Sequence, residues 1–301
     1  MSASRPWFVF WCRIIGLLAA IVALTQLQAC SAVKLAYNNL PEVAYWWIDG
    51  YADLNEPQSL KVREELARLH QWHRATELPK VADLLRKMQQ LAPGDTTPEQ
   101  VCGLYAEVRN RIDTLVAQAE PATVGVAMGL SGAQLAHIEA KFAKTNAEWR
   151  DDWAAGTPAV RQEKRLKAAV ERSEQFYGTL EERQLAVLRQ AVARSEFDPQ
   201  LSFAERLRRQ QDMLQTLRQN SLSAAGARSS VAQATTALRA YLERSLNSPN
   251  PAYRSYSDKA TLDSCKTLAQ LHNSTTAEQR ERAIRRLAAY ERDARELAAQ
   301  R

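Results

Sequence analysis

The sequence predicts an all-α protein, a multi-helix bundle that can be elongated. Its composition favours helices, because glycine is scarce, with 10 residues in 301, while alanine, leucine, glutamine and arginine are abundant. Apolar residues recur at the spacing of helices, and no sustained strand-like alternation occurs. Several segments combine a capping residue with a glutamine or glutamate three positions later, as helix starts do. We therefore expect at least seven helices and essentially no sheet.

The first element of the chain is a secretion signal that ends in a lipoprotein motif. An apolar run over residues 14–24 follows two arginines, and it is short for a membrane-spanning helix but suits a signal peptide. The motif Leu27-Gln28-Ala29-Cys30 comes next. Lipoprotein signal peptidases require a small residue, here Ala29, directly before the cysteine that carries the lipid. The motif therefore predicts lipidation of Cys30.

Cleavage before Cys30 divides the chain into a lipoprotein signal peptide, residues 1–29, and a periplasm-facing all-helical domain, residues 30–301. The mature cysteine would carry three acyl chains, palmitate among them, which exceeds what stable membrane anchoring needs. Lipoproteins retained in the inner membrane have aspartate at the next position, whereas this chain has Ser31, so we expect the periplasmic face of the outer membrane. An uncleaved membrane helix over residues 7–27 is the alternative.

The charge of the mature chain gives no support for a nucleic-acid partner. The full chain has a formal net charge of +6, and the signal contains two arginines and no acidic residue, which leaves +4 for residues 30–301. Nucleic-acid binding needs a more basic surface than this. The chain also lacks a glycine-rich phosphate loop, a nucleophile elbow and a paired-cysteine metal site. We therefore expect no cofactor, no metal and no catalytic residue.

Residues 31–54 form an aromatic-rich stretch directly after the expected anchor. Tryptophan and tyrosine favour the headgroup region of a bilayer, so the stretch can lie at the membrane interface. It can also be a first helix that packs its aromatic face on the body, and the asparagines and acids between the aromatic residues favour this second interpretation. The aromatic residues are Tyr37, Tyr45, Trp46, Trp47 and Tyr51.

The helices that follow are predicted from their apolar stripes and their breaks. The first covers residues 57–76, and Pro79 then predicts a kink or break before a short helix that ends at Leu91. Proline, glycine and asparagine mark the later turns, at residues 92–95, 156–158, 198–199 and 248–251. Further helices are expected after Thr97, after Ser131, over residues 160–177, around 185–192, around 203–217, and over 231–246, 252–272 and 276–299.

Five helix starts share a capping box, in which the capping side chain accepts from the third helical N–H and the residue there reaches back to the cap. The pairs are Asn55 with Gln58, Thr97 with Gln100, Ser131 with Gln134, Thr179 with Glu182, and Thr276 with Gln279. The apolar stripes after these starts should face inward. We expect buried side chains at Leu135, Phe142, Leu188, Leu207 and Leu214.

Two cysteines remain in the mature chain besides Cys30. Because the periplasm oxidises thiols, we expect Cys102 and Cys265 to form a disulfide. The bond would tie the helix after Thr97 to the helix after Pro251. Two unrelated cysteines that stay reduced are the alternative.

One face of the first long helix carries the candidate site. His70, His73 and Glu77 lie at i, i+3 and i+7, and such a face can hold a divalent metal, although the sequence supplies no further ligand. In the alternative the cluster is structural, Glu77 pairs with Arg74, and His73 and Arg74 form hydrogen bonds to residues 37–53. The candidate functional surface consists of Trp72, His73, Arg74 and Glu77.

Three motifs in the first third of the chain resemble one protein family. They are Tyr37-Asn38-Asn39-Leu40-Pro41, then Trp46-Trp47 with Asp49, Tyr51, Asp53 and Leu54, and finally Trp72-His73-Arg74 followed by Glu77-Leu78-Pro79. With the cysteine motif, they resemble an uncharacterised proteobacterial lipoprotein family, domain-of-unknown-function family 6279. The resemblance implies a location in the envelope and no reaction.

A second resemblance rests on one capping box. Leu130-Ser131-Gly132-Ala133-Gln134 is similar to the leucine-threonine-x-x-glutamine box of small helical periplasmic chaperones. Residues 54–58 and 180–184 are similar but lack the serine or threonine. Helix capping alone accounts for such a box.

We therefore expect a lipid-anchored outer-membrane lipoprotein with a binding or scaffolding role in the cell envelope, an envelope protein as partner, and no catalytic activity. A helical periplasmic chaperone is the first alternative, and it predicts an exposed concave apolar surface. An enzyme or metal-binding protein that uses His70, His73 and Glu77 is the second alternative, and it predicts a deep pocket with converging titratable groups.

Overall fold

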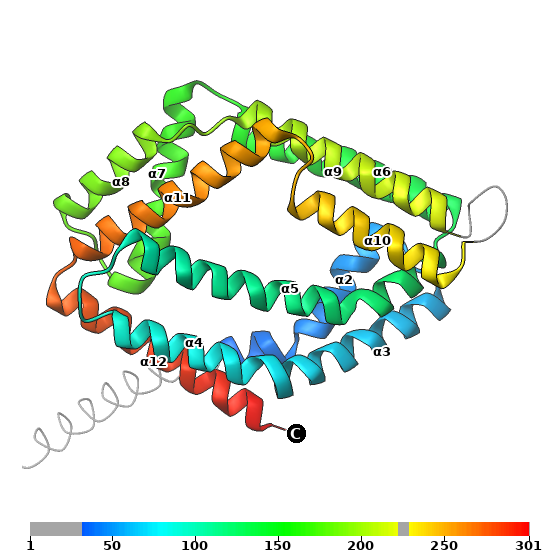
Figure 1. Cartoon of the computed structure of the whole chain (residues 1–301), viewed down its shortest axis with the longest axis horizontal. Coiled ribbons are helices and arrows are strands. Elements are labelled where there is room, and N and C mark those ends of the chain that lie inside the picture. Colours follow the sequence, from blue (N-terminus) through cyan, green and yellow to red (C-terminus); the bar gives the residue numbers. More distant parts are fainter. Residues whose placement is uncertain (1–31, 222–228, 301) are drawn as a thin grey trace, which may run out of the picture.

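The computed structural model describes residues 32–221 and 229–300, so the expected signal peptide, residues 1–29, and Cys30 lie outside the described residues. Within the described ranges the chain forms helices and no strand, which confirms the predicted all-α class (Figure 1). Residues 32–38 are helical and precede α2, and two π-helical turns, η1 (His73–Glu77) and η2 (Arg150–Ala154), interrupt the later helices. The α-helices are α2 (Leu40–Ala52), α3 (Glu56–Trp72), α4 (Leu78–Leu91), α5 (Pro98–Met128), α6 (Gly132–Trp149), α7 (Pro158–Tyr177), α8 (Glu182–Arg194), α9 (Pro199–Asn220), α10 (Val231–Leu246), α11 (Pro251–Asn273) and α12 (Ala277–Ala299).

The long helix α5 runs through the middle of an elongated body, and the other helices lie around it (Figure 1). Its 31 residues span roughly 46 Å at the helical rise of 1.5 Å per residue. The helices α4 and α12 pack side by side along one edge, and α6 and α9 pack along the opposite edge. At one end of the body, α8 packs between α7 and α11.

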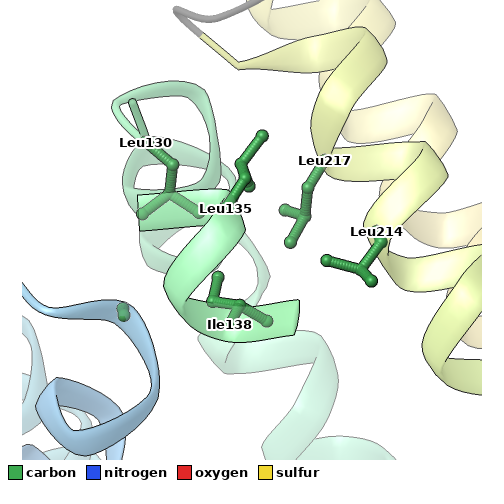
Figure 2. Packing of buried hydrophobic residues seen from close by; sticks show 6 residues of the cluster. Leu130, Leu135, Ile138, Leu214 and Leu217 are labelled. Carbon is green, nitrogen blue, oxygen red and sulfur yellow. The ribbon is translucent and has the colours of Figure 1, made fainter. Parts of the chain in front are cut away.

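Most buried apolar side chains in the described part of the chain gather in four clusters instead of one central core. The first cluster joins the start of α6 to α9, and Figure 2 shows its leucines facing one another across the two helices. The others join α8 to α11 and α12, α4 to α12, and α5 to α10. Because no single core holds all the helices, specific links between helices contribute strongly to this fold. The first cluster contains Ala52, Leu130, Leu135, Ile138, Leu214 and Leu217.

The predicted core residues are confirmed in part. Leu135, Leu188 and Leu214 are buried, as the stripes predict. Burial of Phe142 and Leu207 was predicted wrongly, because both side chains are only partly buried. Phe142 packs at the margin of the first cluster, where its ring lies 5.9 Å from that of Tyr51. In a small apolar cluster many residues lie at the edge, so the outer residues of an apolar stripe remain partly exposed to solvent.

Four of the five predicted capping boxes form, at Asn55, Thr97, Ser131 and Thr276. The prediction at Thr179 is wrong, because α8 begins two residues later and Gln184, not Glu182, reaches back to the amide of its cap Glu181 at 2.8 Å.

The later start of α8 has a physical reason. Gln184 also bonds across to Gln279, and the carbonyl of Thr179 accepts from the same Gln279 side chain at 3.0 Å. These tertiary bonds fix where α8 begins. A further box, Ser230 with Gln233 at the start of α10, was not predicted.

The glutamines of four capping boxes form two pairs, and each pair joins two helices. Gln58 and Gln134 exchange amide hydrogen bonds of 3.3 and 2.7 Å, and so join α3 to α6. Gln184 and Gln279 do the same at 2.6 and 3.0 Å, and so join α8 to α12. Each pair is extended by backbone carbonyls, since these amides also donate to Gly129, Asp53, Ser274 and Thr179. One side chain thus caps its own helix and holds a second helix.

Pro79 produces a kink and not a break. The chain passes from α3 through η1 into α4 without leaving helical geometry, and Pro79 lies in the first turn of α4, where a missing donor costs little. The wider π-helical turn directly before it accommodates the ring.

The structure brings Cys102 of α5 and Cys265 of α11 to disulfide distance. Their Sγ atoms lie 2.07 Å apart and their Cα atoms 5.5 Å apart. This geometry confirms the predicted pairing and the predicted link between the two helices. The link spans 163 positions of sequence.

Candidate functional site

The predicted functional surface holds the N-terminal helix on the body. His73 Nδ1 lies 2.9 Å from the hydroxyl of Tyr37, and His70 Nε2 lies 3.1 Å from the carbonyl oxygen of Tyr37. Arg74 donates to the side chain of Asn38 at 2.7 Å. These contacts confirm the structural version of the prediction, in which His73 and Arg74 bond to the aromatic segment. Trp72 lies half-buried on the same stretch.

Glu77 is turned toward α5 and is 1% exposed. Lys80 donates to one carboxylate oxygen at 2.7 Å, and Arg111 donates to the other at 3.2 Å. Burial raises the pKa of Glu77, but the two cations outweigh burial and hold the pKa below its ordinary value. The predicted pairing with Arg74 is wrong. Because η1 is wider than an α-helical turn, Glu77 leaves the face it would share with Arg74.

The same contacts occupy the atoms that a metal would need. Tyr37 engages a ring nitrogen of both His70 and His73, and two cations neutralise Glu77. In the described part of the chain, no three His, Cys, Asp or Glu side chains come together in the arrangement of a metal site.

The N-terminal helix is also held by the C-terminal end of α12. Lys34 donates to Glu296 at 2.6 Å, and Arg74 of η1, which bonds to Asn38, also donates to Gln300 at 3.1 Å. The Tyr37 side chain packs against the apolar cluster between α4 and α12. The residues directly after the expected anchor are therefore fixed to the body from two sides.

The aromatic residues that follow divide between two faces of α2. Tyr45 is buried and donates to Ser59 at 3.2 Å, whereas Trp46 and Trp47 point outward and are 60% and 66% exposed. Leu40 and Val43 are exposed beside them, at 49% and 60%. We call these four exposed residues the outer face of α2. The segment therefore packs its tyrosines on the body, as the favoured interpretation predicts, but keeps an apolar surface free.

A groove lies at the other end of the body, between α7, α8 and α11. It has a volume of about 920 Å³. Alanines, leucines and a valine form its floor, and arginines and lysines stand around it. The cations are Arg165, Arg172, Arg194, Lys259 and Lys266.

The sequence did not predict this groove, although one signal was present. Arg165 and Arg172 are seven residues apart on one helix, a spacing that places them on one face. The partner helix α11 is distant in sequence, and only the tertiary fold brings it opposite α7 and α8.

Burial lowers the pKa of three histidines below the ordinary value, those of His70, His73 and His272. His272 shows the cause most clearly. Its Nε2 donates to the carbonyl of Gly94 at 2.9 Å, and because the lowered pKa favours the neutral ring, Nδ1 accepts from the hydroxyl of Tyr177 at 3.0 Å. Burial raises the pKa of Tyr177 to about 12, which keeps its proton in this bond.

We expect the protein to lose stability as the pH falls from 7.5 to 5.5. A histidine with a lowered pKa binds its proton less readily in the folded than in the unfolded state, where the pKa is about 6.5. The contribution of this histidine to the free energy of unfolding is therefore complete above about pH 6.5. It is lost as the pH falls toward the pKa that the histidine has in the folded state. Urea unfolding at both pH values measures the loss. Replacement of His272 by glutamine should reduce the difference.

The exposed His137 supplies the matched control, and His137→Gln should keep the full pH dependence. Carboxylates titrate mainly below this window, since their ordinary pKa values are about 4. A free energy of unfolding that is equal at both pH values in the unchanged protein would contradict the prediction.

No helix within residues 32–221 and 229–300 combines the length and the apolar composition that crossing a bilayer requires. A protein-family model described as a family of unknown function (DUF6279) matches residues 50–238, which is more than half of the chain. The matched range includes η1 and both Trp72 and Glu77, and it ends within α10. No curated protein and no solved structure matches the chain.

Proposed function

Because this chain belongs to the family of unknown function DUF6279, we propose a function from its own geometry. It is a lipoprotein anchored through Cys30 on the periplasmic face of the outer membrane. Its helical body binds or scaffolds an envelope protein and catalyses no reaction. The outer face of α2 is the observation that carries this proposal.

The composition of the outer face suits the surface of a bilayer. Trp46 and Trp47 are amphipathic rings of the kind that gather at the headgroup level, and Leu40 and Val43 add apolar area beside them. Apolar side chains that stand together on a surface mark an interaction site. Leu35, in the helical residues that precede α2, is exposed as well.

The position of the outer face in the chain also supports contact with the bilayer. Leu40 lies ten positions after Cys30, which limits their separation to roughly 35 Å even in an extended chain. Residues 32–38 are helical, which shortens the reach further. A lipid on Cys30 would thus hold α2 close to the headgroups.

The contacts of the candidate site explain how the body would keep one orientation. His70, His73 and Arg74 fasten the helix over residues 32–38, and this helix connects the anchor to α2. An anchor on a loose tether would leave the body free to tumble. A clamped N-terminal helix instead presents the same side of the body to the periplasm.

We expect lipids to quench the fluorescence of Trp46 and Trp47. The protein is purified from membranes and placed in phosphatidylcholine vesicles brominated near the acyl-chain carbonyls, because bromine quenches tryptophan at short range. The unchanged protein should be quenched, and Trp46→Phe with Trp47→Phe should remove most of the effect. In parallel, palmitate labelling in cells should mark the unchanged protein and not the Cys30→Ser variant.

The matched control is Trp149→Phe with Trp153→Phe, which also removes two tryptophans but leaves α2 intact and should keep the quenching. The labelling and the quenching experiments test the anchor and the bilayer contact separately. Label on the Cys30→Ser protein would overturn the anchor. Absence of quenching in a labelled, vesicle-bound protein would overturn the contact between α2 and the bilayer.

A further inference from the structure

We infer that the groove between α7, α8 and α11 binds an amphipathic anion, a molecule with one acyl chain and a carboxylate or phosphate headgroup. The inference does not depend on the membrane anchor. It rests on three features of the groove, which are its unpaired arginines, its apolar floor and its size.

The arginines of the groove have no carboxylate partner. Two acids lie in the groove, and each is already paired with a lysine, Glu196 with Lys259 and Asp263 with Lys266. Arg165, Arg172 and Arg194 form no salt bridge with a carboxylate of the described chain. Positive charge without a counter-charge, next to a low-dielectric surface, attracts an anion.

Arg165 is the cation that the protein itself holds in place. Its guanidinium donates to the Ser195 hydroxyl at 3.0 Å and to the Val192 carbonyl at 3.3 Å, and it lies 4.8 Å from the ring centre of Phe197. Burial lowers its pKa from the ordinary value. Because none of these partners is charged, the positive charge of Arg165 stays uncompensated.

The floor of the groove explains why the ligand should carry a hydrocarbon chain. Ala169 and Val192 are partly exposed in it and Leu268 is exposed in the same lining, whereas Leu188 and Leu271 are already buried. An inorganic anion would leave this surface in contact with water. An acyl chain would cover it, with a gain of about 25 cal/mol for each Å² of apolar surface removed from water.

The size of the groove fits a single-chain lipid. A volume of about 920 Å³ lies within the range of roughly 300–1,000 Å³ that is usual for small-molecule sites. The groove is partly open to solvent, so a ligand can enter it. Trp153 lines it and can report on binding through its fluorescence.

The test uses the full folded protein and four defined probes below their micellar concentrations. Dodecanoate and dodecyl phosphate carry both features of the ligand, inorganic phosphate carries only the charge, and dodecyl maltoside carries only the chain. Calorimetry and Trp153 fluorescence should show binding of the first two and at least tenfold weaker binding of the last two. The relative affinity of the first two distinguishes carboxylate from phosphate sources.

The variant Arg172→Gln with Arg194→Gln should weaken binding of both anionic lipids about tenfold, which corresponds to about 1.4 kcal/mol. Both side chains are exposed and neither holds another helix, so the variant should fold. Arg285→Gln with Arg286→Gln on α12 removes the same charge outside the groove and should leave the affinity unchanged.

Several results would overturn the inference. Equal affinity for dodecyl maltoside would show a purely apolar site, and equal affinity for inorganic phosphate would show a site for small anions. Equal weakening by the α12 variant would show a non-specific charge effect. Binding of an acidic helical peptide without binding of dodecanoate would assign the groove to a protein ligand instead.

Discussion

Replacement of both Cys102 and Cys265 by alanine should lower the free energy of unfolding by up to about 5 kcal/mol. The bond closes a loop across 163 positions of sequence, and the entropy that a cross-link removes from the unfolded chain grows with the size of the loop. Chemical unfolding of the oxidised protein and of the double variant measures the difference.

The fold gives this bond more importance than its loop length alone. Four clusters contain most of the buried apolar side chains in the described part of the chain, and none of them joins α5 to α11, although these two helices pack side by side. The disulfide adds a covalent link between them, from the start of α5 to the end of the body that carries the groove. We expect the double variant to lose the tight packing of α11 first.

A reducing agent supplies the control for this prediction. It should lower the stability of the unchanged protein and leave the double alanine variant unaffected, since only the first contains the bond. Equal stability of the unchanged protein with and without the reductant would show that the bond adds nothing to this fold.

Features that depend on local chemistry could be predicted from the sequence. The start of α5 at Pro98 follows from Thr97 and Gln100, because capping, the missing N–H of proline and the return bond of glutamine all act within one turn. The disulfide also followed from the sequence, because in the expected oxidising compartment, with Cys30 expected to carry the lipid, only Cys102 and Cys265 are left to pair.

Features that depend on which helices meet could not be predicted. The cap of α8 is Glu181 and not the predicted Thr179, because Gln279, nearly 100 positions further along the chain, bonds to Gln184. The sequence predicts a helix over residues 160–177 but not its neighbours, and only the tertiary fold places α11 in one groove with Arg165 and Arg172. The candidate site was predicted only in part. His73 and Arg74 bond to the predicted segment, whereas Glu77 bonds to Arg111 and not to the predicted Arg74.

The variant Gln184→Ala should lower the free energy of unfolding by about 3 kcal/mol. The side chain of Gln184 is fully buried and takes part in four hydrogen bonds, with the Glu181 amide, the Ser274 carbonyl and the Gln279 side chain. Its removal leaves buried polar groups without partners, and each such group costs about 1–3 kcal/mol. Urea unfolding measures the loss.

A second glutamine separates the capping role from the pairing role. Gln233 closes the same kind of box at the start of α10, and within the described residues it bonds only to Ser230 of that box. Gln233→Ala should therefore cost under about 1 kcal/mol, the range of a lost cap.

A double-mutant cycle of Gln184→Ala with Gln279→Ala should give a coupling energy of about 1–3 kcal/mol, since the two amides bond to each other. Equal costs for Gln184→Ala and Gln233→Ala, with no coupling in the cycle, would mean that the glutamine only caps its helix. The four bonds would then contribute nothing to holding α8 against α12.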